Sequence, residues 1–488
     1  MFVGAASDDA RSLDPVAAKT KMDLAALAGL DTVRMTVLWS PGQAIVAGDD
    51  AVALQNAVSA AQLDGVRLIL SIYPGEPRAT PLSSRARGEF ASFAASIARR
   101  FPAIRDFVVG NEPNLNRFWM PQFGLGGVDL AARSYELLLA HTYDALKSVS
   151  DDVNVIGGAL SPRGQDKATS VRQTHSPTTF IADLGAAFRA SGRTRPIMDM
   201  FAIHPYLIPS LLPPSFAHPR TTTIGIGDYP KLVRLLTRAF AGTGQRGETL
   251  PIVYDEFGYQ SQIPRAKQRF YNHIHAPAAK DAIPESLQAA YYRQAFALAA
   301  CQPTVAGVLI FHVIDERDAR AWQSGLYYSD GTPKASLAPV RTAALAAQNG
   351  TLTGCVREKT TDNVSGIVFH EPSATDPRVL AVDFSCTLPC SYQLRVLDAQ
   401  TSEVVAATEG KAVGGQTSTL PAAGLAAGTY EYALRVFKCG KPGTATTRYS
   451  RPFTLPTTTT VDAVAPTGPV VAAAPVFPTL LPTVPAAG

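Results

Sequence analysis

The sequence predicts a (β/α)8 barrel followed by a small all-β sandwich and an extended tail rich in Pro, Thr and Ala. Over the first 345 or so residues, short apolar runs alternate with helical patterns rich in Ala and Leu. The pattern then changes to short segments in which apolar and polar residues alternate, separated by Gly and Pro. The last stretch has a composition that cannot bury a core. These three sequence patterns predict the barrel, the sandwich and the tail in that order.

Eight apolar runs are strand candidates, and each is followed by a helical pattern or a long loop. The strands are expected at residues 2–5, 32–38, 66–72, 107–110, 153–157, 198–204, 251–255 and 307–313. Helices are expected at residues 14–30, 51–63, 87–100, 130–148 and 285–301. This alternation is typical of a closed parallel barrel. An open doubly wound sheet is the alternative, and it is disfavoured because no Gly-rich phosphate loop follows any strand.

The predicted domain boundaries are 1–347 for the barrel, 348–455 for the sandwich and 456–488 for the tail. The sandwich is expected to have about seven or eight short strands. It contains no Trp, so a packing or spacer role is favoured over a sugar-binding aromatic platform.

The composition limits the class of partner. The chain has 488 residues, 46% of them hydrophobic, and a formal net charge of +4. That length and composition allow a real core and more than one domain. Nucleic acid is not expected as a partner, because no Lys/Arg cluster alternates with aromatic residues. No apolar run reaches the roughly 18 residues of a membrane span. The oligomeric state is left open.

Four of the five cysteines fall in the predicted sandwich: Cys355, Cys386, Cys390 and Cys439. They are expected to form two disulfides, with three possible pairings. Zinc binding is the weaker alternative, because the Cys-x3-Cys spacing has no His nearby. Cys301 lies alone in a helical pattern and is expected to be a buried thiol. The disulfides favour a mature secreted or cell-surface protein that has lost its signal peptide, with a cytoplasmic protein as the alternative.

Two of the apolar runs deliver a glutamate to the end of a strand. Asn111-Glu112-Pro113 follows the fourth run, and Glu256 follows the seventh. In a parallel barrel these ends lie on the catalytic face. Splitting the acetal between two sugars requires one carboxyl that donates a proton and one that stays ionised, so the pair predicts glycoside chemistry. Asn111 is suited to bind a sugar hydroxyl.

Each glutamate has a plainer interpretation. Glu112 could be a solvated turn residue, and Asp255 could be the active carboxylate in place of its neighbour. Strand alternation places Tyr254 and Glu256 on one face and Asp255 on the other, which favours Glu256.

Three further polar residues are expected to line the same site. His204 and Tyr206 end the sixth strand two positions apart, and a tyrosine hydroxyl there could orient the nucleophile. A packed core His is the alternative. Arg34 is a charge inside an apolar strand, and a catalytic carboxylate would provide its partner.

Aromatic residues near strand ends are candidates for stacking on sugar rings. They are Trp39, Trp119 and Trp322, with His312 at the end of the last strand. Ordinary core packing is the alternative for each Trp. The segments 206–229 and 257–284 are expected to be long loops that wall the cleft. His273 and His275 in the second loop do not form a convincing metal motif, so no metal is expected.

The segment Gly110-Asn-Glu-Pro-Asn-Leu-Asn-Arg-Phe-Trp119, with Tyr135 and residues 153–158 downstream, resembles the acid/base region of glycoside hydrolase family 39. This family has retaining hydrolases on (β/α)8 barrels and includes β-xylosidases, α-L-iduronidases and endoglycosidases. The resemblance covers roughly residues 1–345 and is looser around Glu256. The chain departs from the family in its long seventh loop and in its last strand, which leaves the substrate open.

By position, the resemblance implies Glu112 as general acid/base, Glu256 as nucleophile and Asn111 as a contact to the sugar 2-hydroxyl. It also implies that Arg34, His204 and Tyr206 line the site. The expected function is a retaining, exo-acting glycoside hydrolase with a carbohydrate substrate and no cofactor. An endo-acting polysaccharide hydrolase or transglycosylase is the first alternative. A non-catalytic carbohydrate-binding protein at the cell surface is the second.

Overall fold

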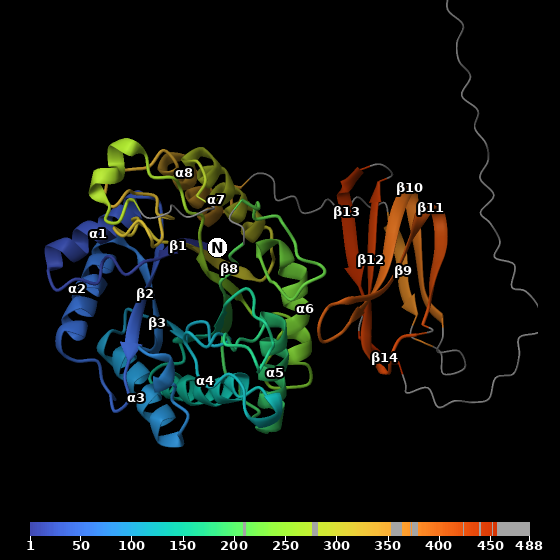
Figure 1. The fold of residues 1–488 in the computed structure, drawn as a ribbon, viewed down its shortest axis with the longest axis horizontal. Coiled ribbons are helices and arrows are strands. Elements are labelled where there is room, and N and C mark those ends of the chain that lie inside the picture. Colours follow the sequence, from blue (N-terminus) through green and yellow to red (C-terminus); the bar gives the residue numbers. More distant parts are fainter. Residues whose placement is uncertain are drawn as a thin grey trace, which may run out of the picture.

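The structure is a computed structural model that describes residues 1–207, 211–275, 282–352, 364–370, 372, 379–422, 424–438, 441–450 and 452–455. These residues form a barrel ringed by helices and a separate β domain (Figure 1). The expected tail at 456–488 lies outside the described residues.

Eight strands close the barrel, as the sequence predicts. They are β1 (Phe2–Ala6), β2 (Thr32–Trp39), β3 (Arg67–Pro74), β4 (Asp106–Val109), β5 (Asn154–Leu160), β6 (Met200–Ile203), β7 (Ile252–Phe257) and β8 (Val305–Phe311). Each pairs in parallel with the next, and β1 pairs with β8 to complete the circle. The carboxyl ends of all eight strands therefore meet on one face.

The helices surround the strands in chain order (Figure 1). They are α1 (Pro15–Leu27), α2 (Gly48–Asp64), α3 (Ser84–Arg100), α4 (Ala131–Lys147), α5 (Pro177–Ala190), α6 (Tyr229–Ala239), α7 (Glu285–Ala300) and α8 (Leu337–Gln348). Short 3-10 helices occur at η1 (Pro77–Ala79), η2 (Leu125–Gly127), η3 (Ile226–Asp228) and η4 (Arg265–Phe270). The sequence analysis did not name α5, α6 or α8. In α5 the signals are present, because Ser176 caps its first turn through the Thr179 amide and Pro177 begins it.

Two apolar layers hold the barrel together. The larger one lies between strands and helices. The smaller one fills the inside of the barrel with residues from the strands alone: Ile69, Val108, Ile156, Ala159, Ala202, Val253 and Leu309. Because this inner layer closes the barrel from within, the carboxyl-end face is a cavity with a floor rather than a pore.

The β domain differs from the expected sandwich. Its strands are β9 (Val364–His370), β10 (Val379–Asp398), β11 (Val404–Pro421), β12 (Gly428–Lys438), β13 (Lys441–Tyr449) and β14 (Phe453–Leu455). Among the described residues they form one six-stranded antiparallel sheet, curled around a single apolar cluster. The two short strands expected at 379–384 and 392–396 are halves of β10. Its first half pairs with β9 and its second half with β12, so one long strand takes the place of two.

The cysteines match the prediction in part. Cys386 and Cys390 form a disulfide within β10. Cys301 is disulfide-bonded, so the expectation of a lone buried thiol is wrong. It follows the last residue of α7 and is half-buried there, which leaves its sulfur accessible to a partner. Cys355 and Cys439 lie outside the described residues. No group of His, Cys, Asp and Glu in the described part of the chain is arranged to hold a metal ion.

The β domain contacts the barrel beside α6. Glu431 of β12 is nearly fully buried and pairs with Arg234, whose Nε lies 2.7 Å from Oε1, and with Arg238. The guanidinium of Arg234 also lies 3.7 Å from the ring centroid of Tyr449. In the segments that the structure describes, no helix is long and apolar enough to cross a membrane.

Candidate active site

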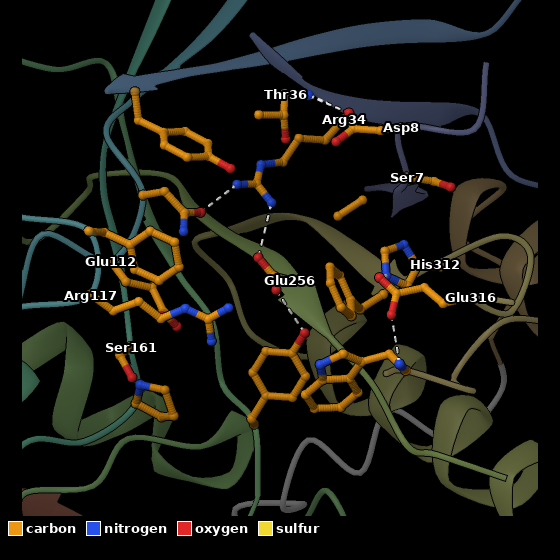
Figure 2. Close-up of a pocket in the computed structure, with 18 of the residues that line it drawn as sticks. Ser7, Asp8, Arg34, Thr36, Glu112, Arg117, Ser161, Glu256, His312 and Glu316 are labelled. Carbon is orange, nitrogen blue, oxygen red and sulfur yellow. Dashed lines mark hydrogen bonds and ion pairs between the residues drawn. The ribbon is translucent and has the colours of Figure 1, made fainter. Parts of the chain in front are cut away.

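A cavity of about 600 Å³ opens at the carboxyl ends of the barrel strands. Glu112 follows β4 and Glu256 is in β7, and both line this cavity (Figure 2). Arg34, Asn111, Tyr206, His312 and Trp322 line it as well. Most of the predicted site residues thus meet in one place, because a parallel barrel brings its strand ends together.

Glu112 has an unusual backbone conformation. Its φ angle is 40°, in the left-handed region that residues with a side chain rarely adopt. Gly110 precedes it with φ 88°, and a Cβ there would lie 3.0 Å from the ring of Tyr135. The amide of Glu112 donates to the carbonyl of Ala159 at 2.8 Å, which holds the turn. Such strained positions cluster at functional sites.

Glu256 has both carboxylate oxygens fixed. The Tyr206 hydroxyl donates to Oε1 at 2.9 Å, and Arg34 donates to Oε2 at 3.2 Å. The Glu256 side chain is 15% exposed, so it reaches the cavity, whereas Asp255 is fully buried and does not line it. The burial pattern favours Glu256 over Asp255 as the group that meets a ligand.

The alternation argument for Glu256 is wrong, although it favoured the residue that lines the cavity. Tyr254 packs in the layer between strands and helices and donates to Gln302, while Val253 belongs to the inner layer. Asp255 therefore points inward with Val253. A register irregularity between Tyr254 and Phe257 breaks the alternation, so that Glu256 also faces the cavity.

Arg34 connects the two halves of the site. It is nearly fully buried and donates from Nη2 to Asn111 Oδ1 at 2.9 Å and to Ser71 Oγ at 3.1 Å. Its Nε lies 3.6 Å from Asp255 Oδ2, and it also pairs with Glu256. Burial lowers the pKa of Arg34, but the charges of Asp255 and Glu256 outweigh it and the net shift is upward. The buried arginine thus has the carboxylate partners that the sequence predicts.

His204 lies between three carboxylates. Its Nδ1 is 3.1 Å from Glu112 Oε1 and 3.4 Å from Glu256 Oε2, and its Nε2 is 3.3 Å from Asp255 Oδ1. Burial alone would lower the pKa of His204. The negative charges of Glu256 and Asp255 outweigh this and raise the pKa to about 10. The ring therefore carries a proton at neutral pH. His204 is fully buried and does not line the cavity, so the expectation that it contacts the substrate is wrong, and it contacts the two glutamates that do line the cavity.

The shared histidine also limits how far apart the two glutamates lie. Oε1 of Glu112 and Oε2 of Glu256 each contact the same nitrogen of His204, so these two oxygens are no further apart than the sum of the two distances, 6.5 Å.

Two of the three candidate tryptophans are core residues. Trp39 is 0% exposed, packs on Phe90 and donates to the carbonyl of Gln43. Trp119 is 1% exposed and packs edge-on against Tyr135. Neither lines the cavity, so their assignment to substrate binding is wrong. Trp39 packs on a ring of α3 and Trp119 on a ring of α4, so both side chains belong to the core between strands and helices. Trp322 does line the cavity, against Tyr206 and Phe311.

Several cavity residues were missed by the sequence analysis: Ser7, Asp8, Thr36, Tyr73, Arg117, Phe118, Ser161, Arg163, Gln260 and Glu316. Asp8 is the second residue after β1, so the strand-end rule that found Glu112 would have found it too. Arg117 and Phe118 lie within the segment that resembles family 39. Arg163 lies on a loop, where no periodicity marks its direction. His273, by contrast, pairs with Asp318 at 3.2 Å, and neither His273 nor His275 lines the cavity.

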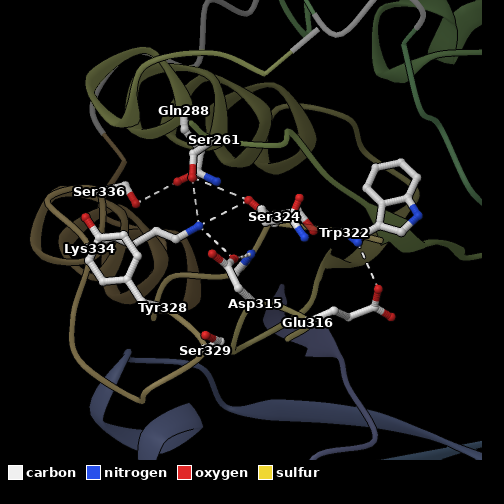
Figure 3. A network of polar contacts seen from close by, with 12 residues as sticks. Ser261, Gln288, Asp315, Glu316, Trp322, Ser324, Tyr328, Ser329, Lys334 and Ser336 are labelled. Carbon is white, nitrogen blue, oxygen red and sulfur yellow. Dashed lines mark hydrogen bonds and ion pairs between the residues drawn. The ribbon is translucent and has the colours of Figure 1, made fainter. Parts of the chain in front are cut away.

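A buried polar network supports the eighth loop of the barrel (Figure 3). Lys334 donates to Asp315 at 2.7 Å and to Ser261 at 2.8 Å, and both charged side chains are essentially unexposed. Tyr271 donates to the other oxygen of Asp315 at 2.7 Å. Because Ser261 and Tyr271 belong to the seventh loop, the network fastens that loop to the one that carries Trp322.

No family model matches the sequence, and no curated protein matches it. Solved structures that resemble the chain include β-glucuronidase 2 of Bacteroides uniformis, at 12% identity and TM-score 0.44. That match covers 93% of this chain and 46% of the glucuronidase, so the chain spans about half of that enzyme's length.

Two other similar structures are close to this chain in length. An endo-β-1,4-mannanase from Thermotoga petrophila has 12% identity and TM-score 0.44 over 94% of this chain and 98% of its own. A GH39 enzyme from Xanthomonas axonopodis pv. citri has 15% identity and TM-score 0.42 over 86% and 94%. These are likenesses of overall structure, and the chemistry is argued below from this chain's own residues.

Proposed function

We propose that the protein is a retaining glycoside hydrolase, with Glu256 as nucleophile and Glu112 as general acid/base. The observation that carries this proposal is the pairing of Glu112 and Glu256 across one nitrogen of His204, at the carboxyl ends of β4 and β7. Retaining enzymes have carboxyl groups about 5–5.5 Å apart, and inverting enzymes about 6.5–9.5 Å. The two oxygens that share His204 Nδ1 lie at most 6.5 Å apart, a bound on one pair of oxygens that is compatible with the retaining separation.

The reaction would run in two displacements. First, a Glu256 oxygen forms a bond to the anomeric carbon while the bond to the leaving oxygen breaks, and Glu112 gives its proton to that oxygen. Second, a water molecule attacks the same carbon, Glu112 takes the proton from the water, and the bond to Glu256 breaks. The sum is the addition of one water across the glycosidic bond, and Glu112 and Glu256 return to their starting states.

The neighbouring side chains have supporting roles in this scheme. Tyr206 and Arg34 hold the two oxygens of Glu256, so that one can face the anomeric carbon. Asn111 is held by Arg34 through its carbonyl oxygen, which leaves its amide nitrogen as a donor for a sugar hydroxyl. Trp322 offers an aromatic face on the cavity wall. None of these steps requires a metal or an organic cofactor.

The test is a panel of nitrophenyl glycosides assayed with wild type, Glu112→Gln and Glu256→Gln. Hydrolysis of one member by wild type, and a loss of roughly 10³-fold or more in both variants, would support the proposal. Proton NMR of the first-formed product should show the same anomeric configuration as the substrate. Inverted product, or normal activity in a folded Glu256→Gln protein, would contradict it.

We propose exo action, and the support for it is that Leu207 and Gln260, near the starts of the two long loops, line the cavity. The panel above addresses this as well. Release of nitrophenol from a monosaccharide glycoside supports exo action. Hydrolysis of polysaccharides alone would support the endo-acting alternative.

We also propose that the protein works outside the reducing cytoplasm. The Cys386–Cys390 disulfide and the bonded state of Cys301 favour an oxidising compartment. Free-thiol titration of protein taken from its native compartment tests this. Reactive thiols at Cys386 and Cys390 would contradict it.

A further inference from the structure

The charged residues of the cavity are divided between two sides (Figure 2). Glu112, Arg117 and Ser161 lie on one side of Glu256, and Asp8, His312 and Glu316 lie on the other. Arg163, two residues after Ser161, lines the same cavity. Glu112 and Glu256 aside, the side that holds Glu112 carries the cations Arg117 and Arg163. The opposite side carries the carboxylates Asp8 and Glu316.

Arg117 and Arg163 are the two cationic side chains on the Glu112 side of the cavity. In the part of the chain that the structure describes, no carboxylate lies within ion-pair distance of Arg117 or Arg163. Arg34, deeper in the same cavity, pairs with two carboxylates. Arg117 lies 5.3 Å from the ring centroid of Phe118, a contact that orients the guanidinium and leaves its N–H groups unused. Partial burial lowers the pKa of Arg163. Both arginines are solvent-exposed and line the cavity, so their guanidinium groups are accessible to a carboxylate or a sulfate of a bound ligand.

The carboxylates on the opposite side have capacity for neutral sugar hydroxyls. Asp8 accepts the Thr36 amide at 2.6 Å through Oδ1, so its Oδ2 is available. Glu316 accepts the Trp322 amide at 2.8 Å through Oε2, and Oε1 lies 3.5 Å from His312 Nε2. An acidic sugar placed between these two carboxylates would be repelled.

The proposed reaction identifies the two sides. Glu112 protonates the leaving oxygen, so the group that leaves must lie on the Glu112 side. The sugar that becomes bound to Glu256 lies toward Asp8 and Glu316. We propose that the substrate is a neutral sugar linked to a leaving group that carries a carboxylate or a sulfate, and that Arg117 and Arg163 bind this anion. The assignment of sides rests on the proposed function.

The kinetic test compares two leaving groups on the same sugar, the one that the nitrophenyl panel identifies. One substrate is the 4-nitrophenyl glycoside and the other is the 3-carboxy-4-nitrophenyl glycoside. Because the two differ in intrinsic reactivity, each variant is compared with wild type on each substrate separately. Arg117→Gln/Arg163→Gln should lose about tenfold or more kcat/KM on the carboxylated substrate relative to its loss on the neutral one.

Arg105→Gln is the matched control. Arg105 is an exposed arginine just before β4, at the opposite end of the barrel, and its variant should leave both substrates unaffected. Adding 0.5 M NaCl should lower the kcat/KM of wild type on the carboxylated substrate more than on the neutral one, because salt screens the attraction between the arginines and the carboxylate. Equal losses on both substrates in the double variant, or no loss, would overturn the proposal.

A binding measurement separates this proposal from the proposed function. Saturation-transfer NMR of the full chain is recorded with methyl glucuronoside, glucose 6-sulfate and methyl glucoside. The two anions should give signals that the double variant loses and Arg105→Gln keeps, and the stronger of the two distinguishes a carboxylate from a sulfate ligand. Anion signals that persist unchanged in the double variant would overturn the anion site, whatever signal the neutral glucoside gives at the opposite side of the cavity. Arginine-dependent anion binding without hydrolysis of any glycoside would keep the anion site, and would overturn both the proposed function and the leaving-group assignment.

Discussion

The hydroxyl of Tyr206 donates a hydrogen bond of 2.9 Å to Oε1 of Glu256, from the end of β6 to β7. Burial and the nearby charge of Glu256 raise the pKa of this tyrosine well above its ordinary value, so the hydroxyl keeps its proton and acts as a donor. The bond fixes one carboxylate oxygen and leaves the position of the other to Arg34.

Replacing Tyr206 with Phe tests this contact. A hydrogen bond to a charged group contributes about 1.5–3 kcal/mol, so kcat/KM should fall roughly 10- to 100-fold. The ring remains, and its packing on Trp322 and Phe311 should keep the fold. The measurement is steady-state kinetics with circular dichroism as a folding control. Unchanged kcat and KM would contradict a role for the Tyr206 hydroxyl in positioning Glu256.

His204 predicts how stability depends on pH. Its pKa is about 10 in the folded protein against an ordinary value of 6.5, so the folded state binds the proton more tightly. The contribution of the His204 proton to the free energy of unfolding is fully present below pH 6.5 and is lost as the pH rises toward 10. Urea unfolding of wild type and His204→Gln across this range should show wild type losing more stability than the variant as the pH rises. If the unfolding free energies of the two proteins changed with pH in parallel, the raised pKa of His204 in the folded state would be contradicted.

The pair of Lys334 and Asp315 predicts a large effect of one buried substitution. Burial lowers the pKa of Lys334 and raises that of Asp315, so each charge depends on the other. Lys334→Met would leave Asp315 buried without its cation and should cost about 3–5 kcal/mol of unfolding free energy.

Lys267→Met is the control for that experiment. Lys267 pairs with Asp330 at 3.0 Å, but its side chain is 25% exposed, so the loss should be at most about 1 kcal/mol. Urea denaturation of both variants makes the comparison. Equal losses would mean that the buried network in Figure 3 does not stabilise the seventh and eighth loops.

Replacing Trp322 should affect substrate binding, whereas replacing Trp39 should affect stability. Trp322→Ala should raise KM about 2- to 10-fold with little change in stability, since Trp322 lines the cavity. Trp39→Ala should instead cost about 3–5 kcal/mol of stability, since its ring is buried against Phe90. Thermal unfolding and substrate-saturation curves of the two variants distinguish these outcomes. A KM effect without destabilisation in Trp39→Ala would contradict the burial argument.

The sequence by itself determined the barrel and the positions of its two glutamates. Apolar runs alternating with helical patterns are local features, and a residue that ends such a run must lie at a strand end whatever the rest of the chain does. Glu112, Glu256, His204 and Tyr206 were found in this way, and Arg34 was found as a charge inside an apolar strand. The β domain was also anticipated, although β10 joins what local turn residues indicated as two strands.

The tertiary structure decided which side chains face one another. Arg34 and Glu256 are 222 positions apart, and only closure of the barrel brings them into contact. The irregularity in β7 that turns Glu256 into the cavity leaves no mark in the alternation of residues. Burial of Trp39 and Trp119, and the unpaired state of Arg117 and Arg163, depend on neighbours supplied by other segments. Local periodicity fixes the place of a residue in an element, and packing alone fixes its partners.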